Sequence, residues 1–308
     1  MFCRRLRVRI AAVASVYADV KRIKIGQRLG RYQIEALLGS GGMGIVYLAQ
    51  DPRTNRRVAI KLLDPARSTM DSAQLLLQEA RTAARLNHPS ICAVREIGRA
   101  GAEPFIVMEH VAGVPLGTVI PKERGLAVEV AARYTAEIVD ALAYAHGEGV
   151  VHGDLKSANI MVAAGGVKVL DFGLAVLRPK SSDSDVDTTR TRESSSACGT
   201  VPYMAPELLR GQRADTRSDV WALGIVMFEM LAGRRPFRGA TPYEAAAAIL
   251  ADSRVPLPCS VPPPFQSVVS RCLCVDRTAR YPSAIELADA IRAEWVSGPA
   301  GKKAPVSV

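Results

Sequence analysis

The hydrophobic period of the chain changes near residues 113–117, and this change constrains the fold more than any other feature. Before it, short apolar runs such as 31–38 and 44–51 are separated by Gly, Pro and Asn, which predicts antiparallel strands. After it, apolar residues recur at helical spacing in segments 128–149 and 218–233, which predicts helices. We therefore expect an α+β chain with a small β-rich first lobe and a larger, mainly α second lobe.

Further elements fill in this outline. A helix is predicted over residues 70–86, and strands over 91–98 and 104–111 complete the first lobe. In the second lobe, Ser218 is the expected N-cap of the helix that ends at Gly233, because serine and glycine favour these two positions.

The net charge of +10 is concentrated at one end of the chain. Residues 1–31 contain nine Lys and Arg and one Asp, whereas the rest of the chain carries 31 basic and 29 acidic residues. A nearly neutral body without a basic-aromatic pattern excludes a nucleic-acid-binding protein, and we interpret the basic end as a solvated extension. The longest strongly apolar stretch, 220–232, contains Glu229 and is too short to cross a bilayer, so no membrane span is predicted.

The cysteines favour a reducing compartment. All six are spread along the chain, and the close pair Cys272 and Cys274 lacks the spacing of a zinc site. Reduced thiols are typical of cytosolic proteins, which predicts a cytoplasmic location. The basic and apolar segment 1–20 weakly resembles a signal peptide, but the nucleotide chemistry inferred below requires the cytosol.

A glycine-rich turn and a lysine form the first candidate phosphate site. Residues 39–46, GSGGMGIV, fit G-x-G-x-x-G-x-V, in which backbone N–H groups can close over phosphate oxygens because glycine has no Cβ atom. A strand-like run follows, whereas a dinucleotide-binding loop would continue into a helix. Lys61 lies in the next strand and needs a carboxylate if it is buried, for which Glu79 is suited. Taken singly, the turn is more typical of a structural hairpin. Lys61 and Glu79, each taken alone, are typical of solvated side chains.

The second lobe carries two more motifs. The segments VHGDLKSANIMV and VKVLDFGLA place Asp154, Lys156, Asn159 and Asp171 in turn-like breaks beside apolar strands. Polar groups in such breaks can converge on one cleft. Each residue alone could be a simple turn former, but the complete set in this order favours phosphate chemistry. Oxygen ligands such as Asn159 and Asp171 suit Mg²⁺ that carries phosphates.

Together these motifs resemble those of the protein kinase superfamily, and within it those of bacterial serine/threonine kinases with the glycine loop LGxGGMGxVYLA. The resemblance extends from about Gly30 to Glu294 and includes ACGTVPYMAPE, SDVWALG and DRTAR. It implies a bilobal protein kinase-like fold with one main helix in the N-lobe. The implied divisions are an N-terminal extension at 1–29, an N-lobe at 30–111, a C-lobe at 112–295 with an activation segment at 171–207, and a C-terminal linker at 296–308.

The resemblance also implies catalytic roles. The residues concerned are Asp154, Lys156, Asn159, Lys61 and Glu79. Asp154 is expected to be the catalytic base, and Lys156 to contact the transferred phosphoryl group. Lys61 is expected to hold the α- and β-phosphates of ATP while paired with Glu79.

An ATP site and a metal site follow from the same resemblance. Asn159 and Asp171 are expected to ligate Mg²⁺, or Mn²⁺ in its place. Adenine is expected to be read by backbone groups of Glu109 and Val111, with Met108 as the gatekeeper. The residues expected around ATP are Gly39, Ser40, Gly41, Gly42, Gly44, Val46, Ala59, Lys61, Met108, Glu109, Val111 and Met161.

Other family positions are implied to be structural. His152, Phe172 and Asp219 resemble residues of the family's internal spine, and Glu207 with Arg280 resembles its buried ion pair. These residues are expected to shape the site without taking part in the reaction.

Two positions depart from the family pattern. Gly153 replaces the arginine of the usual H-R-D, and Ser157 replaces the usual proline after the lysine. Because glycine offers no guanidinium for an activation-loop phosphate, we expect the dephosphorylated enzyme to keep most of its activity. The nine hydroxyl side chains in residues 181–196 are the expected sites of autophosphorylation. Ser157 is expected to matter very little.

The resemblance therefore implies a serine/threonine protein kinase that phosphorylates protein hydroxyls, its own included. Lys156 and Thr200 favour Ser and Thr acceptors over Tyr. The alternative is a pseudokinase that acts as a nucleotide-responsive scaffold, which the intact set of phosphate and metal residues argues against. The sequence leaves open the protein substrate, the pathway and whether the chain forms a homodimer.

Overall fold

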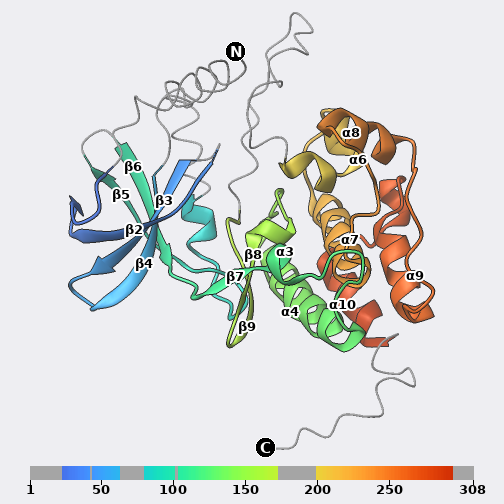
Figure 1. The fold of residues 1–308 in the computed structure, drawn as a ribbon, viewed down its shortest axis with the longest axis horizontal. Helices are drawn as coiled ribbons and strands as arrows, with labels where there is room; N and C mark the ends of the chain where they lie inside the picture. Colours follow the sequence, from blue (N-terminus) through green and yellow to red (C-terminus); the bar gives the residue numbers. More distant parts are fainter. Residues whose placement is uncertain (1–22, 42–43, 63–79, 101–102, 173–198, 294–308) are drawn as a thin grey trace, which may run out of the picture.

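The computed structural model describes residues 23–41, 44–62, 80–100, 103–172 and 199–293. A sheet lobe and a helical lobe lie side by side (Figure 1). Between them lie the small strands β7 (Gly113–Pro115), β8 (Ile160–Ala163) and β9 (Gly166–Val169). The predicted α+β, bilobal fold is confirmed.

The sheet lobe is an antiparallel sheet of six strands in the order β1-β2-β3-β4-β6-β5. Its strands are β1 (Arg28–Leu29), β2 (Tyr32–Gly41), β3 (Gly44–Asp51), β4 (Arg56–Leu62), β5 (Val94–Ala100) and β6 (Glu103–Glu109). The buried side chain of Leu29 belongs to the core of this sheet. The lobe therefore begins before residue 30, the predicted start of the N-lobe.

Alternation along β4 separates the core of the sheet from the cleft. Val58 and Ile60 lie in the core on one face of the sheet, and Ala59 lies on the other face in a cluster with Met108. Because successive strand residues point to opposite faces, Lys61 lies on the same face as Ala59. The strand thus directs an ammonium group toward the cleft.

A second, three-stranded sheet joins the lobes. Its strands are β7 (Gly113–Pro115), β8 (Ile160–Ala163) and β9 (Gly166–Val169). The segment before β5 binds to β9: Cys92 N donates to Val169 O over 2.9 Å, and Val169 N donates to Ser90 O over 2.8 Å. This backbone pairing fixes the sheet lobe against the polypeptide that carries Asp171.

The helical lobe is built around one buried helix. Its helices are α3 (Leu116–Val119), α4 (Val128–Gly147), α6 (Pro206–Leu209), α7 (Thr216–Ala232), α8 (Pro242–Leu250), α9 (Pro263–Cys272) and α10 (Ala284–Ile291). Short 3₁₀ turns are η2 (Ser157–Asn159), η4 (Val201–Tyr203) and η5 (Arg277–Ala279). Helix α7 is buried along nearly its whole length, as expected for a segment that is apolar on every side.

The ends of α7 correct one sequence prediction and confirm another. The N-cap is Asp215 and not Ser218, because the Asp215 carboxylate accepts from the backbone N–H groups of Arg217 and Ser218. Ser218 completes a capping box three residues into the helix. The predicted C-cap at Gly233 is confirmed, with φ of 67° in the left-handed region.

Several predicted segments fall wholly or partly outside the described residues. Of the predicted helix 70–86, residues 80–83 are described and helical. The hydroxyl-rich loop 181–196, the tail 296–308 and residues 1–22 of the extension are not described. Within the described ranges, no helix combines the length and the apolar character needed to span a bilayer.

A buried ion pair joins α6 to the loop before α10. The Arg280 guanidinium donates to both carboxylate oxygens of Glu207, over 2.8 and 2.9 Å, and also to the backbone carbonyl of Cys274 over 2.7 Å. Burial alone would raise the pKa of Glu207, but the hydrogen bonds and charge of Arg280 outweigh it and hold this pKa below its ordinary value. The ion pair implied by the resemblance is confirmed.

We expect Arg280→Met to lower the free energy of unfolding by about 3–5 kcal/mol at neutral pH, because it leaves the Glu207 carboxylate buried without its partner. Urea denaturation measures this loss, and the exposed Arg292 provides the matched control, Arg292→Met. Since the pKa of Glu207 is lowered by folding, the stability contributed by the pair is lost as pH falls below the ordinary value of 4.5. If Arg280→Met lowers the free energy of unfolding at pH 7 no more than Arg292→Met does, this account is contradicted.

Candidate active site

A buried carboxylate on α7 sets the conformation of the loop before β8. Asp219 Oδ2 accepts from His152 N over 2.7 Å, and its Oδ1 accepts from Gly153 N over 2.8 Å. The ring of His146 also contacts Asp219 Oδ2, at 3.0 Å. Because Ala284 N donates to His146 Nδ1, the ring proton lies on Nε2 and points to Asp219. Three donors therefore hold one carboxylate in the core.

Gly153 allows the turn that these bonds hold. Its φ is +75°, in the left-handed region that glycine adopts without the steric cost of a Cβ atom. The next residue is Asp154, so the glycine at this departure from the family pattern is compatible with the placement of the proposed base.

His152 connects this loop to the strand that leads into Asp171. Its Nδ1 accepts from Asp154 N over 3.2 Å, so Nε2 carries the proton and donates to Leu170 O over 2.9 Å. Its ring packs on Phe172 with the centroids 4.7 Å apart. The contacts of His152 thereby link the two motifs of the second lobe.

Asp154, Lys156 and Asn159 converge within this loop. Lys156 Nζ donates to Asp154 Oδ2 over 2.7 Å and to Thr200 Oγ1 over 2.9 Å. Asn159 Nδ2 donates to the backbone O of Asp154 over 2.9 Å and to its Oδ2 over 3.2 Å. The other oxygen, Asp154 Oδ1, is buried and has no hydrogen-bond partner among the described residues. One oxygen of the Asp154 carboxylate thus has hydrogen-bond donors, and the other is buried without one among the described residues.

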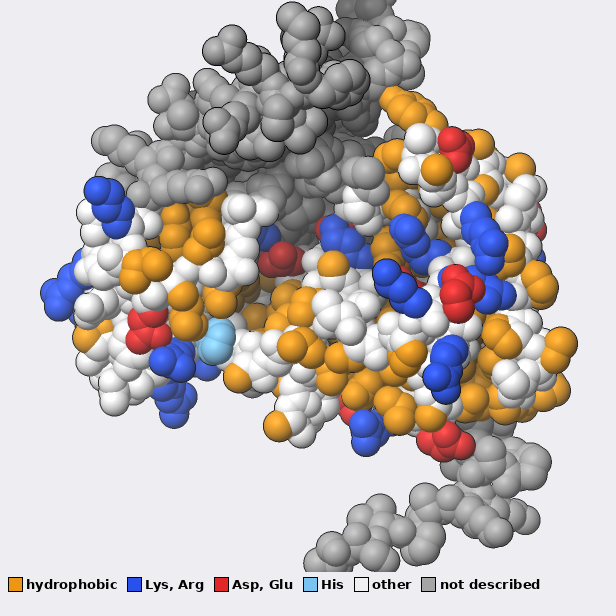
Figure 2. Space-filling view, in the orientation of Figure 1, with side chains coloured by type: hydrophobic (Ala, Val, Ile, Leu, Met, Phe, Trp, Pro, Cys, Tyr) orange, Lys and Arg blue, Asp and Glu red, His pale blue; other side chains and the backbone are white. Residues whose placement is uncertain are grey.

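Lys61 and Asp171 bring the two lobes together. Lys61 Nζ lies 3.0 Å from Asp171 Oδ2, and the lysine side chain is only 4% exposed. Asp171 has a φ of +57°, which is uncommon for a residue other than glycine and is concentrated at functional sites. Glu79, the predicted partner of Lys61, lies outside the described residues. Figure 2 shows acidic and basic side chains side by side where the two lobes meet.

The predicted adenine-binding residues lie on both sides of this junction. Val46 packs on the cluster that contains Ala59 and Met108, and Ala59 is the register partner of Met108 between β4 and β6. Met161 lies on β8 in the second sheet, and Val111 lies in the connection that follows β6.

The glycine turn closes the end of the β2–β3 hairpin. Gly39 pairs with Val46, Ser40 with Ile45 and Gly41 with Gly44. Gly44 has a φ of +121°, which requires glycine, and Gly42 lies outside the described residues. The strand that follows the turn is confirmed, as expected for a phosphate-covering hairpin.

The predicted magnesium ligands fit such an ion. The amide nitrogen of Asn159 donates to Asp154, so the amide oxygen is the atom of this side chain that could bind a metal ion. Asp171 uses Oδ2 for Lys61 and is partly exposed at the lobe junction. An amide oxygen and a carboxylate oxygen are hard ligands of the kind that Mg²⁺ takes from protein beside phosphate oxygens.

Comparison with known proteins identifies the family of this chain. Residues 32–296 match the family described as the protein kinase domain. The chain belongs to this family.

Curated relatives within the family are bacterial. Serine/threonine-protein kinase PknB of Mycolicibacterium smegmatis is 37% identical over 283 residues, which cover 89% of this chain and 44% of that protein. PknB of Mycobacterium leprae is 37% identical over 274 residues, covering 85% of this chain and 43% of that protein. PknA of Mycobacterium tuberculosis is 35% identical over 271 residues, covering 86% and 61%. The chain therefore spans 43% to 61% of the length of these relatives.

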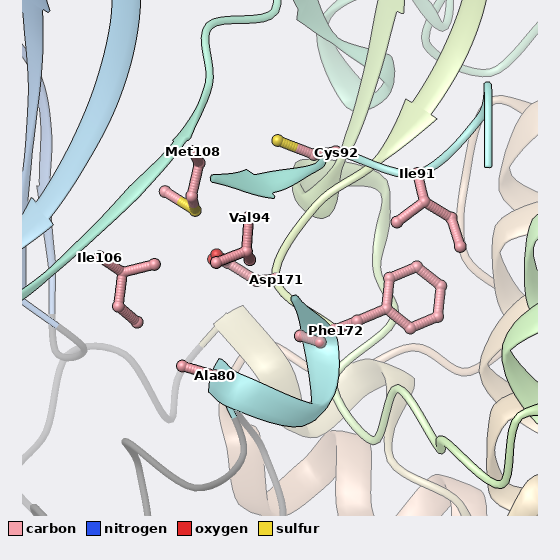
Figure 3. Close-up of a pocket in the computed structure, with 9 residues that line it drawn as sticks. Ala80, Ile91, Cys92, Val94, Ile106, Met108, Asp171 and Phe172 are labelled. Carbon is pink, nitrogen blue, oxygen red and sulfur yellow. The ribbon is translucent and has the colours of Figure 1, made fainter. Parts of the chain in front are cut away.

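A small pocket of the kinase domain lies behind Met108. Its lining includes Cys92, Val94 and Asp171, and Figure 3 shows the Phe172 ring directed away from Met108, below Ile91. Burial raises the pKa of the Cys92 thiol to about 12, with Glu109 adding to the rise. The thiol therefore stays protonated near neutral pH and is a poor nucleophile.

One ion pair next to the segment that is expected to bind adenine was not predicted from the sequence. Lys168 Nζ on β9 donates to Glu109 Oε2 at the end of β6 over 2.9 Å. The backbone of Glu109 is also held in place, because Glu109 N donates to Ala93 O over 2.8 Å. The pair joins two segments 59 residues apart, so no local pattern indicates it. It holds the residue whose backbone is expected to read adenine.

We expect Lys168→Met to weaken Mg·ATP binding about threefold, the effect of losing a partly exposed ion pair. Titration calorimetry measures the dissociation constant, and Lys168→Arg should restore it because the charge is kept. Lys122→Met, at an exposed position of the helical lobe, is the matched control. An unchanged dissociation constant in Lys168→Met would show that this ion pair does not support nucleotide binding.

Proposed function

We propose that this domain is an ATP-dependent serine/threonine protein kinase that transfers the γ-phosphoryl group to protein hydroxyls, including its own. The observation that carries the proposal is Asp154 Oδ1, which is buried and without a hydrogen-bond partner among the described residues. A buried carboxylate oxygen is costly without a donor. The hydroxyl of a Ser or Thr acceptor supplies such a donor.

In the proposed reaction, the acceptor hydroxyl donates to Asp154 Oδ1 while its oxygen attacks the γ-phosphorus. The bond from that phosphorus to the bridging oxygen of ADP breaks, and Asp154 receives the hydroxyl proton. Lys156, 2.7 Å from the other Asp154 oxygen, places positive charge beside the transferred group. Positioning and charge account for most of the rate enhancement in such transfers.

The nucleotide is held from the opposite lobe. We assign Lys61 to the α- and β-phosphates, and the glycine turn at 39–44 to the cover over them. Asn159 and Asp171 hold Mg²⁺ or Mn²⁺, which neutralises charge on the phosphate oxygens. Lys61 and Asp171 are 3.0 Å apart, so the phosphate ligand from the sheet lobe and the metal ligand from the helical lobe meet at one point.

Specificity for Ser and Thr rests on Lys156 and Thr200. Their contact of 2.9 Å lies beside Asp154, and the relatives PknB and PknA carry the name serine/threonine-protein kinase. Because ATP is a cytosolic substrate, we assign the domain to the cytoplasm. The pseudokinase alternative gains no support, since Gly153 accommodates the turn at +75° that leads into Asp154.

We expect Asp154→Asn to reduce phosphoryl transfer about 10²–10⁴-fold, because the amide cannot take the acceptor proton. The assay incubates the protein with γ-labelled ATP and Mg²⁺ and counts label on protein. Removing the metal with a chelator should stop transfer, and either Mg²⁺ or Mn²⁺ should restore it. The rise in melting temperature caused by Mg·ATP should persist in the variant, since Asp154 is not assigned to the nucleotide.

Asp140→Asn is the matched control, because Asp140 lies on α4 with its side chain 65% exposed. Wild-type protein that transfers no phosphate would contradict the proposed function. Transfer by Asp154→Asn within about threefold of wild type would assign the base to another residue.

A further inference from the structure

Ser157 has a specific place in the structure, although the sequence analysis gives it little importance. It follows Lys156, opens the turn η2 and is only 5% exposed. Its hydroxyl lies 2.9 Å from the hydroxyl of Tyr203, the last residue of η4. The usual proline of the family at this position has no hydroxyl and could not make this contact.

The hydrogen bond between Tyr203 and Glu229 fixes the direction of the bond between Ser157 and Tyr203. Tyr203 OH donates to Glu229 Oε2 over 2.7 Å. Because a phenol has one proton to donate, the contact with Ser157 requires the serine to be the donor and Tyr203 the acceptor. The order is therefore Ser157 to Tyr203 to Glu229, from the loop of Asp154 to helix α7.

Two features keep this chain of bonds in place. Burial raises the pKa of Tyr203 and the charge of Glu229 raises it further, so the phenol stays protonated at neutral pH. Gly117 of α3 leaves the space for the serine hydroxyl, since a Cβ atom there would lie 2.9 Å from Ser157 Oγ.

The turn at 200–203 is consequently tied to the catalytic loop at two points. The first is Lys156 to Thr200, and the second is Ser157 to Tyr203. A single contact leaves the turn free to pivot about it, whereas two contacts fix its orientation. Glu229 anchors the second contact on α7, the helix that also carries Asp219.

We propose that Ser157 is a positioning residue that holds the turn at 200–203 in register with Asp154 and so sets the affinity for the protein acceptor. The inference rests on the proposed function, because it assumes that an acceptor hydroxyl reaches Asp154. Its physical basis is separate, since the tether itself can be measured without phosphoryl transfer.

The experiment compares Ser157→Ala and Tyr203→Phe, which each remove the bond between the two hydroxyls. Gly117→Ala is a third variant that crowds the serine hydroxyl without removing a polar atom. The exposed serine after α8 gives the matched control, Ser253→Ala. Kinetics with dephosphorylated casein as acceptor give KM for casein, KM for ATP and kcat, and hydrogen exchange gives the opening of residues 199–204.

We expect the KM for casein to rise about fivefold in Ser157→Ala, the factor for one neutral hydrogen bond. The rise should be at least as large in Tyr203→Phe, which also removes the bond to Glu229. The KM for ATP should stay at the wild-type value, and amide exchange at 199–204 should become faster by a similar factor. The double variant should resemble Tyr203→Phe, because that substitution already removes the bond to Ser157. Gly117→Ala should shift the same two readouts.

Unchanged casein KM and unchanged exchange in both single variants would overturn the proposal. An equal rise in the KM for ATP would also overturn it, because the effect would then belong to the whole cleft. If wild-type protein transfers no phosphate to casein or to itself, the proposed function fails, and the exchange data alone decide whether Ser157 holds the turn.

Discussion

The carboxylate of Asp219 organises the candidate active site from within the core. It accepts from the backbone N–H groups of His152 and Gly153 and from the ring of His146, and it is 1% exposed. A buried carboxylate requires several donors, and here two of those donors belong to the residues that immediately precede Asp154. The same contacts that satisfy Asp219 therefore fix the backbone on which the proposed base is mounted. Gly153 adopts the required φ of +75° without strain.

Helix α7 also supports the turn at 200–203, which is proposed to face the protein acceptor. The helix carries Asp219 near its start and Glu229 near its end. Glu229 accepts a hydrogen bond from the hydroxyl of Tyr203. The N-terminal turn of the helix is capped by Asp215, and the Glu207–Arg280 ion pair packs beside it through the bond from Ser218 to Glu207. A helix buried on all sides cannot shift without opening the core. It is consequently a rigid base for both the catalytic loop and the turn at 200–203.

The sequence predicts the features that depend on local pattern and misses those that depend on distant partners. The two lobes, the hairpin at the glycine turn and the clustering of Asp154, Lys156 and Asn159 follow from periodicity and from the short spacing within one motif. The prediction of Ser218 as the N-cap of α7 was wrong, because Asp215 and Ser218 both suit an N-cap and the capping box uses both. The partners of Lys168 and Ser157 lie 59 and 46 residues away, so neither contact has a local signal. The predicted pair of Lys61 and Glu79 stays a prediction.

The most direct test of the role of Asp219 is the rate of phosphoryl transfer in Asp219→Asn. An amide has one acceptor oxygen, and its NH₂ group would face one of the backbone N–H donors, so the loop would lose its fixed conformation. The account predicts that kcat falls at least about tenfold, equivalent to a charge-assisted hydrogen bond of about 1.5 kcal/mol. The dissociation constant for Mg·ATP should rise by a smaller factor than kcat falls, because Lys61 and the glycine turn lie on the other lobe and only the proposed metal ligands lie near the altered loop. A variant that folds, binds Mg·ATP and transfers phosphate at the wild-type rate would contradict the account.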